Sequence, residues 1–131
     1  MKVTSAALSL NVPDVSASAA FLQRHLGFVV DMEHDGVTSL TRPDVGLNLI
    51  FLRTGLDSFK PASHAASAGP GLLIVFVVHD IDDQYARLQA EGVHVVTPIE
   101  TEPWGERYFQ MRDSNGVIYQ LVQWMSDADA G

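Results

Sequence analysis

The sequence contains no cysteine, which excludes disulfide bonds, thiolate metal sites and cysteine nucleophiles. No apolar run approaches the roughly 20 residues that span a bilayer, and the first residues lack the basic and apolar blocks of a secretory signal. Cationic residues are scarce, with 8 Lys and Arg against 16 Asp and Glu, so the net charge is −8. Such a chain repels phosphate backbones. We therefore expect a soluble cytoplasmic protein that binds neither membranes nor nucleic acid. Its acidic surface either attracts a cationic ligand or serves only solubility.

The sequence also lacks the common catalytic motifs. It has no GxSxG nucleophile motif, no phosphate-binding glycine loop and no HExxH pattern, and its carboxylates form no recognisable acid/base pair. The histidines are scattered along the chain, and we expect them to be structural or exposed, with only the one in the central linker able to reach a cavity. They are His25, His34, His64, His79 and His94.

The most informative feature that is present is an internal repeat, because residues 8–30 and 74–96 follow the same plan. Each copy has an apolar strand, an Asp, a helix-length segment, a Gly and a β-branched strand. Asp14 and Asp80 are placed to cap the helices, with Ser16 and Asp82 as alternative caps. Gly27 and Gly92 follow the helices, where a left-handed conformation ends a helix.

Three strands are expected after each helix, separated by turn residues. The predicted ranges are 28–33, 36–42 and 46–52 in the first half, and 93–97, 106–112 and 116–124 in the second. Pro98 to Gly105 separates two of these strands, and Asn115-Gly116 predicts a hairpin. The predicted organisation is therefore a first βαβββ module at 1–52, a linker or lid at 53–70 containing Phe59, and a second module at 71–131.

This βαβββ repeat resembles the glyoxalase/bleomycin-resistance/extradiol-dioxygenase superfamily, also called vicinal oxygen chelate proteins, from about Val3 to Trp124. The segments that carry the resemblance are 11–14, Phe21, 26–28, 104–109, 113–116 and 118–123. The resemblance implies an α+β fold of two tandem modules, whose curved mixed sheets form half-barrels with the helices outside. It also implies a homodimer, swapped or unswapped, that completes the cavities and covers exposed module edges.

The resemblance also implies four metal-ligand positions, on the first and last strands of the two modules. In this sequence they fall on Ala7, Leu73, Asn48 and Gln120, where Gln120 replaces the usual Glu. Aliphatic side chains cannot coordinate a metal, and two neutral amides are weak ligands for a divalent ion. We therefore expect neither a metal nor another cofactor.

Strand alternation then predicts which side chains face the cavity. Ser9, Asn11, Asn48 and Ile50 share a face in the first module if Ala7 faces the cavity, and Gln120 shares one with Trp124 in the second. Aromatic side chains next to neutral amides are typical of a small-molecule pocket. The predicted ligand-binding residues are Trp104, Tyr108, Asn48, Gln120, Asn11, Ser9, Ile50, Trp124, Phe59 and His64. Arg107 is expected to pair with a carboxylate or with the ligand.

Three functions are compatible with these residues. The first is a resistance protein that sequesters a bulky aromatic natural product or antibiotic of the bleomycin, mitomycin or quinone type between its modules, without catalysis. The second is a metal-dependent lyase or dioxygenase of the same fold, against which Ala7 and Leu73 argue. The third is a metal-free isomerase whose base the sequence does not identify. The sequence favours the first.

Overall fold

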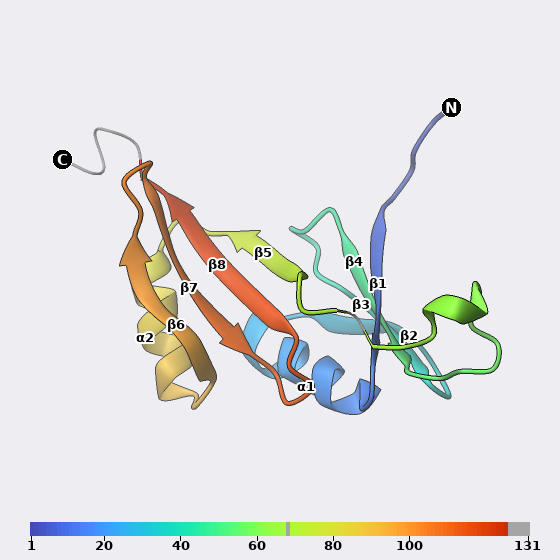
Figure 1. Cartoon of the computed structure of the whole chain (residues 1–131). Helices are drawn as coiled ribbons and strands as arrows, with labels where there is room; N and C mark the ends of the chain where they lie inside the picture. The colour runs from blue at the N-terminus through green and yellow to red at the C-terminus, as the bar shows by residue number, and fades with distance from the viewer. Residues whose placement is uncertain (68, 126–131) are drawn as a thin grey trace. The chain divides into compact units, whose positions relative to one another are not determined.

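The computed structural model describes residues 1–67 and 69–125, which belong to two compact units (Figure 1). The first unit runs from Met1 to Pro70 and the second begins at Gly71. Each unit consists of one helix and one mixed four-stranded sheet. This arrangement confirms the predicted α+β fold of tandem βαβββ modules, and each sheet remains open rather than closing into a barrel.

The first unit has the strand order β1-β4-β3-β2, in which β1 and β4 are parallel and the other neighbours are antiparallel. Its elements are β1 (Ala7–Val12), α1 (Val15–Leu26), β2 (Val29–His34), β3 (Val37–Thr41), β4 (Asn48–Arg53) and the short 3₁₀ helix η1 (Ala62–His64). The second unit repeats this pattern in the order β5-β8-β7-β6. Its elements are β5 (Leu73–Val77), α2 (Ile81–Ala90), β6 (His94–Thr101), β7 (Glu106–Arg112) and β8 (Ile118–Trp124).

The first helix begins and ends where the sequence predicts. The Asp14 carboxylate accepts a hydrogen bond from the Ala17 N–H at 3.1 Å, which satisfies one free amide of the first turn. Gly27 ends the helix with a φ of 69°, a left-handed conformation that glycine adopts without strain.

The second helix begins at the predicted place with a different cap. The Asp80 carboxylate accepts from the Gln84 side chain at 3.0 Å. The first helical N–H, that of Ile81, donates to Gln123 Oε1 at 3.1 Å. Because Gln123 lies on β8, the start of α2 is tied to the last strand of its own sheet.

The predicted end of the strand beginning near residue 93 is wrong. We expected Pro98 to close it, but β6 continues to Thr101. The strand lies at the sheet edge, and its register shifts between Thr97 and Glu100. A proline that cannot donate to the ladder is tolerated at such a bulge on an edge strand.

Each unit buries one face of its sheet against its helix. In the first unit α1 packs against β2, β3 and β4, and in the second α2 packs against β6, β7 and β8. The largest buried side chains of these cores are Leu22, Leu40, Leu49, Phe51, Ile81, Leu88, Phe109, Met111 and Tyr119. The Phe109 ring lies 4.7 Å from that of Tyr85. Strand alternation leaves the opposite face of each sheet, here called its open face, for other contacts. Neither α1 nor α2, the α-helices in the described ranges, has the length and apolar character to cross a membrane.

Candidate functional site

The open face of the first sheet carries the predicted polar residues in register. Ala7 pairs with Asn48, and Ser9 pairs with Ile50, on the parallel strands β1 and β4. Their neighbours Leu10 and Phe51 turn to the core. Four predicted ligand-binding positions are thus brought to one face, namely Ser9, Asn48, Ile50 and Asn11.

Asn11 is already engaged by the central linker. Its Nδ2 donates to the backbone carbonyls of His64, at 2.8 Å, and Ala66, at 3.0 Å. The Gly55 N–H bonds to the Ala65 carbonyl at 2.8 Å, which closes the loop between them. Asn11 is 7% exposed, and its Oδ1 is buried without a partner among residues 1–67 and 69–125. The Asn11 side-chain amide therefore hydrogen-bonds the linker to β1.

The other two predicted linker residues lie in this closed loop. Phe59 is half-buried, and its N–H bonds to the Leu56 carbonyl at 3.1 Å. His64 is exposed, and its Nδ1 lies 3.0 Å from the Ser63 hydroxyl. A ligand role for either residue stays a prediction.

The open face of the second sheet is apolar along its edge strand. Leu73, Val75 and Val77 are 45%, 47% and 66% exposed on β5. On β8, the strand next to it, Gln120 is 7% exposed and Trp124 is 54% exposed. An exposed aliphatic row beside an indole and an amide has the composition of a surface that binds an aromatic molecule.

A row of polar side chains crosses this face from the opposite edge. Thr97, Gln110 and Gln120 lie on β6, β7 and β8 at paired positions. The Thr97 hydroxyl donates to Gln110 Oε1 at 2.6 Å, and Gln110 Nε2 donates to Gln120 Oε1 at 2.8 Å. Val75 continues the row on β5. The row thus consists of three hydrogen-bonded polar side chains followed by the exposed aliphatic side chain of Val75.

Two of the predicted aromatic residues, Trp104 and Tyr108, lie in or near the turn between β6 and β7. Trp104 is 66% exposed in that turn. The Tyr108 hydroxyl lies 2.7 Å from a Glu100 carboxylate oxygen and 2.9 Å from one of Glu102. Hydrogen bonding to these two carboxylates raises the pKa of Tyr108, because a phenolate there would face two negative charges. Tyr108 is therefore a neutral phenol at physiological pH.

Arg107 pairs with a carboxylate, which was one of its two predicted roles. Its guanidinium makes two hydrogen bonds to the Asp82 carboxylate, at 2.6 and 3.2 Å, and a third to the Thr101 hydroxyl at 2.8 Å. Hydrogen bonding to Arg107 lowers the pKa of Asp82. The pair joins β7 to the first turn of α2.

The side chains at the positions that the resemblance assigns to a metal are poor metal ligands. Ala7 on β1 is the register partner of Asn48 on β4. On the second sheet Gln120 faces Val75, whereas Leu73 faces Ile118. Both pairs thus combine a neutral amide with an aliphatic group, which is a poor donor set for a divalent ion. Within residues 1–67 and 69–125, no three His, Cys, Asp or Glu side chains gather as a metal site.

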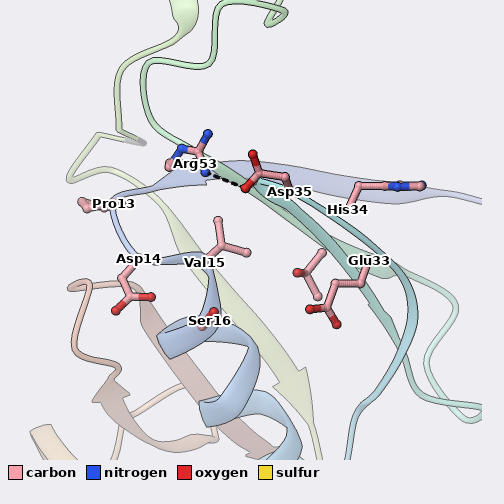
Figure 2. Close-up of a pocket in the computed structure, with 10 residues that line it drawn as sticks. Pro13, Asp14, Val15, Ser16, Glu33, His34, Asp35 and Arg53 are labelled. Atoms are coloured by element: carbon pink, nitrogen blue, oxygen red, sulfur yellow. Dashed lines mark hydrogen bonds and ion pairs between the residues drawn. The ribbon is translucent and has the colours of Figure 1, made fainter.

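A separate polar pocket of about 760 Å³ lies at the start of α1 in the first unit (Figure 2). Asp14, Ser16, Glu33 and His34 line it, together with Arg53, whose guanidinium lies 3.2 Å from the Asp35 carboxylate. The predicted ligand-binding residues lie elsewhere. Sequence reasoning missed this pocket because its walls come from the helix start, the β2–β3 turn and the end of β4.

Sequence reasoning also missed Thr97 and Gln110, which the structure joins to Gln120. A signal for Gln110 was available, because strand alternation places it on the same face as Tyr108. The same signal was hidden for Thr97, since the bulges in β6 interrupt the alternation.

Several solved structures share this fold. A glyoxalase/bleomycin resistance protein/dioxygenase from Nocardioides aligns with a TM-score of 0.80 and 22% identity, covering 100% of this chain and 89% of that one. TioX from Micromonospora sp. ML1 aligns with a TM-score of 0.73 and 22% identity over 94% of this chain and 100% of its own. TnmS3, an antibiotic binding protein from Streptomyces sp. CB03234, gives 0.69 and 22% over 94% and 98%.

The sequence comparison agrees with the fold. No curated protein matches the sequence significantly. The family model for the Glyoxalase/Bleomycin resistance protein/Dioxygenase superfamily matches residues 4–121, which is most of the chain. The matched range begins before β1 and ends within β8. The chain therefore belongs to the Glyoxalase/Bleomycin resistance protein/Dioxygenase superfamily.

Proposed function

We propose that this protein binds a bulky planar aromatic molecule, such as an antibiotic of the quinone type, and sequesters it in the cytoplasm without converting it. The observation that carries the proposal is the open face of the second sheet, where Leu73, Val75 and Val77 on β5 are 45–66% exposed and Trp124 on the neighbouring strand β8 is 54% exposed. Burying such a surface under an aromatic ring yields about 25 cal/mol per Å² of apolar area. Burial of apolar area is therefore enough to bind an aromatic ring, and no chemical reaction with the ligand is needed.

The residues next to this apolar row support binding rather than catalysis. Gln120 and Gln110 are neutral amides, which orient a ligand but do not transfer protons at physiological pH. The Tyr108 phenol is held neutral by Glu100 and Glu102. TnmS3, whose fold is similar, is described as an antibiotic binding protein, which is consistent with this proposal.

The proposal includes two further elements. The first is a role for Trp104, whose indole is 66% exposed and can stack on a planar ring. The second is a homodimer, because β1 and β5 lie at sheet edges and a second copy could cover exposed strands. Light scattering coupled to size-exclusion chromatography measures the dimer, and a monomer at micromolar concentration would contradict it.

The ligand proposal is tested by titrating the protein with naphthalene, a planar probe without polar atoms, in equilibrium dialysis. We expect saturable binding to the native chain, and an affinity about tenfold lower in Trp124→Ala, since stacking on one aromatic ring contributes about 1–3 kcal/mol. Val29→Ala is the matched control, because Val29 is also exposed, at 55%, but lies on the first sheet. Equal affinity of the Trp124 and Val29 variants would reject this face as the site. The same comparison with Trp104→Ala tests the second indole.

A further inference from the structure

We infer that the Gln120 amide is a hydrogen-bond donor of fixed direction, which selects aromatic ligands that carry an acceptor oxygen such as a carbonyl. The inference deepens the proposed function and rests on it. A ligand of this apolar surface would then also need a hydrogen-bond acceptor that pairs with the Gln120 NH₂ group. The supporting observation is that Thr97 donates to Gln110 and Gln110 in turn donates to Gln120.

The distances define the direction of this row. Thr97 Oγ1 and the Gln110 side-chain atom that faces it are 2.6 Å apart. An O–H···O bond ordinarily spans about 2.5–3.0 Å, whereas N–H···O spans about 2.7–3.2 Å. The short contact therefore fits an oxygen of Gln110 toward Thr97, which turns the Gln110 NH₂ toward Gln120. Its contact of 2.8 Å with Gln120 Oε1 lies within the range for an amide donor.

The Gln120 NH₂ group is then left at the end of the row. The Gln120 Oε1 accepts the hydrogen bond from Gln110 Nε2. The Gln120 Nε2 has no hydrogen-bond partner among residues 1–67 and 69–125. Gln120 as a whole is 7% exposed, and its Nε2 is not one of the fully buried atoms, so the NH₂ group can be reached from the open face. Each bond in the row also polarises the next, which strengthens the terminal N–H groups as donors.

The surroundings of this donor determine which ligands it accepts. Val75, the register partner of Gln120, is aliphatic and 47% exposed, and Val77 is 66% exposed on the same strand. A flat hydrocarbon fits this row but leaves the Gln120 N–H groups unpaired beneath it. A ring with a carbonyl oxygen at that point pairs them. A polar group in an apolar site discriminates strongly against ligands that leave it without a partner.

The test compares 1,4-naphthoquinone with naphthalene, which have the same fused rings and differ in the two acceptor oxygens. The chain has no cysteine, so the quinone meets no thiol. We expect the native protein to bind the quinone about tenfold more tightly than the hydrocarbon. Gln120→Leu should remove this preference and bind naphthalene at least as tightly as the native protein, because no N–H group is then left unpaired beneath the ring. Gln89→Leu, on the exposed side of α2, should leave the preference for the quinone unchanged.

A second variant tests the direction of the row rather than the terminal amide. Thr97→Val removes the hydroxyl that holds the Gln110 oxygen, so that both amides can turn over. We expect the preference for the quinone to fall several-fold while naphthalene affinity stays constant. In ¹H–¹⁵N spectra the side-chain amide peaks that vanish in Gln120→Leu should shift with the quinone and not with naphthalene. Thermal melting verifies that both variants are folded.

The outcomes separate the two proposals. Equal affinity for both probes in the native protein, or an unchanged preference in Gln120→Leu, would overturn the donor assignment and leave the aromatic site intact. Binding of neither probe would overturn the proposed function for rings of this size and the donor assignment with it. A preference that is lost in Gln120→Leu and reduced in Thr97→Val, with naphthalene bound throughout, supports both.

Discussion

At the scale of single residues, buried and half-buried polar side chains of this protein hold its segments together. Asn11 joins the linker to β1, and Gln123 joins α2 to β8. Tyr119 donates to Asp113 Oδ2 at 3.2 Å, while Asp113 Oδ1 accepts the N–H groups of Asn115 and Val117. Removing a buried hydrogen bond lowers the stability more than removing an exposed one, because the remaining buried partner cannot bond to water instead.

The first residue-scale prediction concerns Asn11→Asp. The variant exchanges an amide donor for a carboxylate that faces the carbonyls of His64 and Ala66. We expect a free energy of unfolding lower by about 3 kcal/mol at pH 7 and faster proteolysis between residues 55 and 65. The new carboxyl would have a raised pKa, so part of the loss should be regained as the pH falls and the group becomes protonated in the folded state.

The control for this variant is Asn48→Asp, which makes the same change of charge at a half-exposed position of the same face. Urea unfolding at pH 7 and pH 5 measures the stability of both variants. A loss in Asn11→Asp no larger than that in Asn48→Asp would show that the linker is not held by the Asn11 amide.

The second residue-scale prediction concerns Tyr119→Phe. Burial, and after it the negative charge of Asp113, raises the pKa of Tyr119 above its ordinary value of 10.0. Below pH 10 the phenol is protonated in both states, so its contribution to stability is complete there. Above pH 10 the unfolded chain ionises first, and stability is lost as the pH rises.

Tyr119→Phe should therefore be less stable by about 1–3 kcal/mol at pH 8, since Asp113 Oδ2 loses the hydroxyl donor. The difference should narrow between pH 10 and pH 11, because the variant lacks the alkaline loss from this group. Urea unfolding across this range measures both effects. A difference that stays constant with pH would contradict the assigned pKa shift.

At the scale of elements, the turn between β6 and β7 is tightly tied to the end of β8. The Met125 N–H donates to the Gly105 carbonyl at 2.7 Å, and Glu106 pairs with Trp124. Gly105 has a φ of 94°, and a Cβ placed there would lie 2.6 Å from the Met125 carbonyl oxygen. Both observations require glycine at this turn, which also carries Trp104.

We therefore predict that Gly105→Ala lowers the free energy of unfolding by about 2–4 kcal/mol, from backbone strain together with the clash. Gly46→Ala is the matched control, since a Cβ at Gly46 meets nothing within 4 Å and no left-handed φ is needed there. Thermal or urea unfolding measures both variants. Equal stability of the two would contradict the close approach of Gly105 to the Met125 carbonyl.

At the scale of the whole molecule, the two units have the same architecture but carry different side chains on their open sheet faces. The open face of the first sheet carries Ser9, Asn11 and Asn48, and that of the second carries an aliphatic row ending at a hydrogen-bonded amide. The superfamily that contains this chain is named for enzymes as well as for a resistance protein. Its fold therefore does not decide between catalysis and binding, which depends on the side chains of these faces.

The whole-molecule prediction is that metal ions have no part in stability or ligand binding. Ala7 with Asn48, and Val75 with Gln120, supply two neutral amides and no anionic ligand. We expect EDTA to leave the melting temperature and naphthalene affinity unchanged, and added Zn²⁺ to bind at less than one equivalent after dialysis. Elemental analysis measures the bound metal. One equivalent of retained metal that is lost in Gln120→Leu would contradict this prediction.

The two modules can be predicted from the amino-acid sequence, because the signals for them are local. Helix caps, glycines at helix ends and turn residues depend on neighbouring positions, and hence Asp14, Gly27 and Gly92 behave as predicted. Strand alternation likewise places Ser9 with Ile50 on one face. The boundary at Pro98 was wrong, since an edge strand with a bulge accepts a proline that a central strand would not.

The pairing of polar groups from distant segments depends on the three-dimensional fold. The register between β5 and β8 sets Val75 opposite Gln120, and the bulges of β6 set Thr97 beside Gln110. Asn11 reaches carbonyls more than 50 positions away in the sequence. Such pairings depend on how separate strands and loops align, which residue spacing along one segment does not encode. The direction of the amide row, and with it the donor that we assign to Gln120, follows from distances between atoms on different strands.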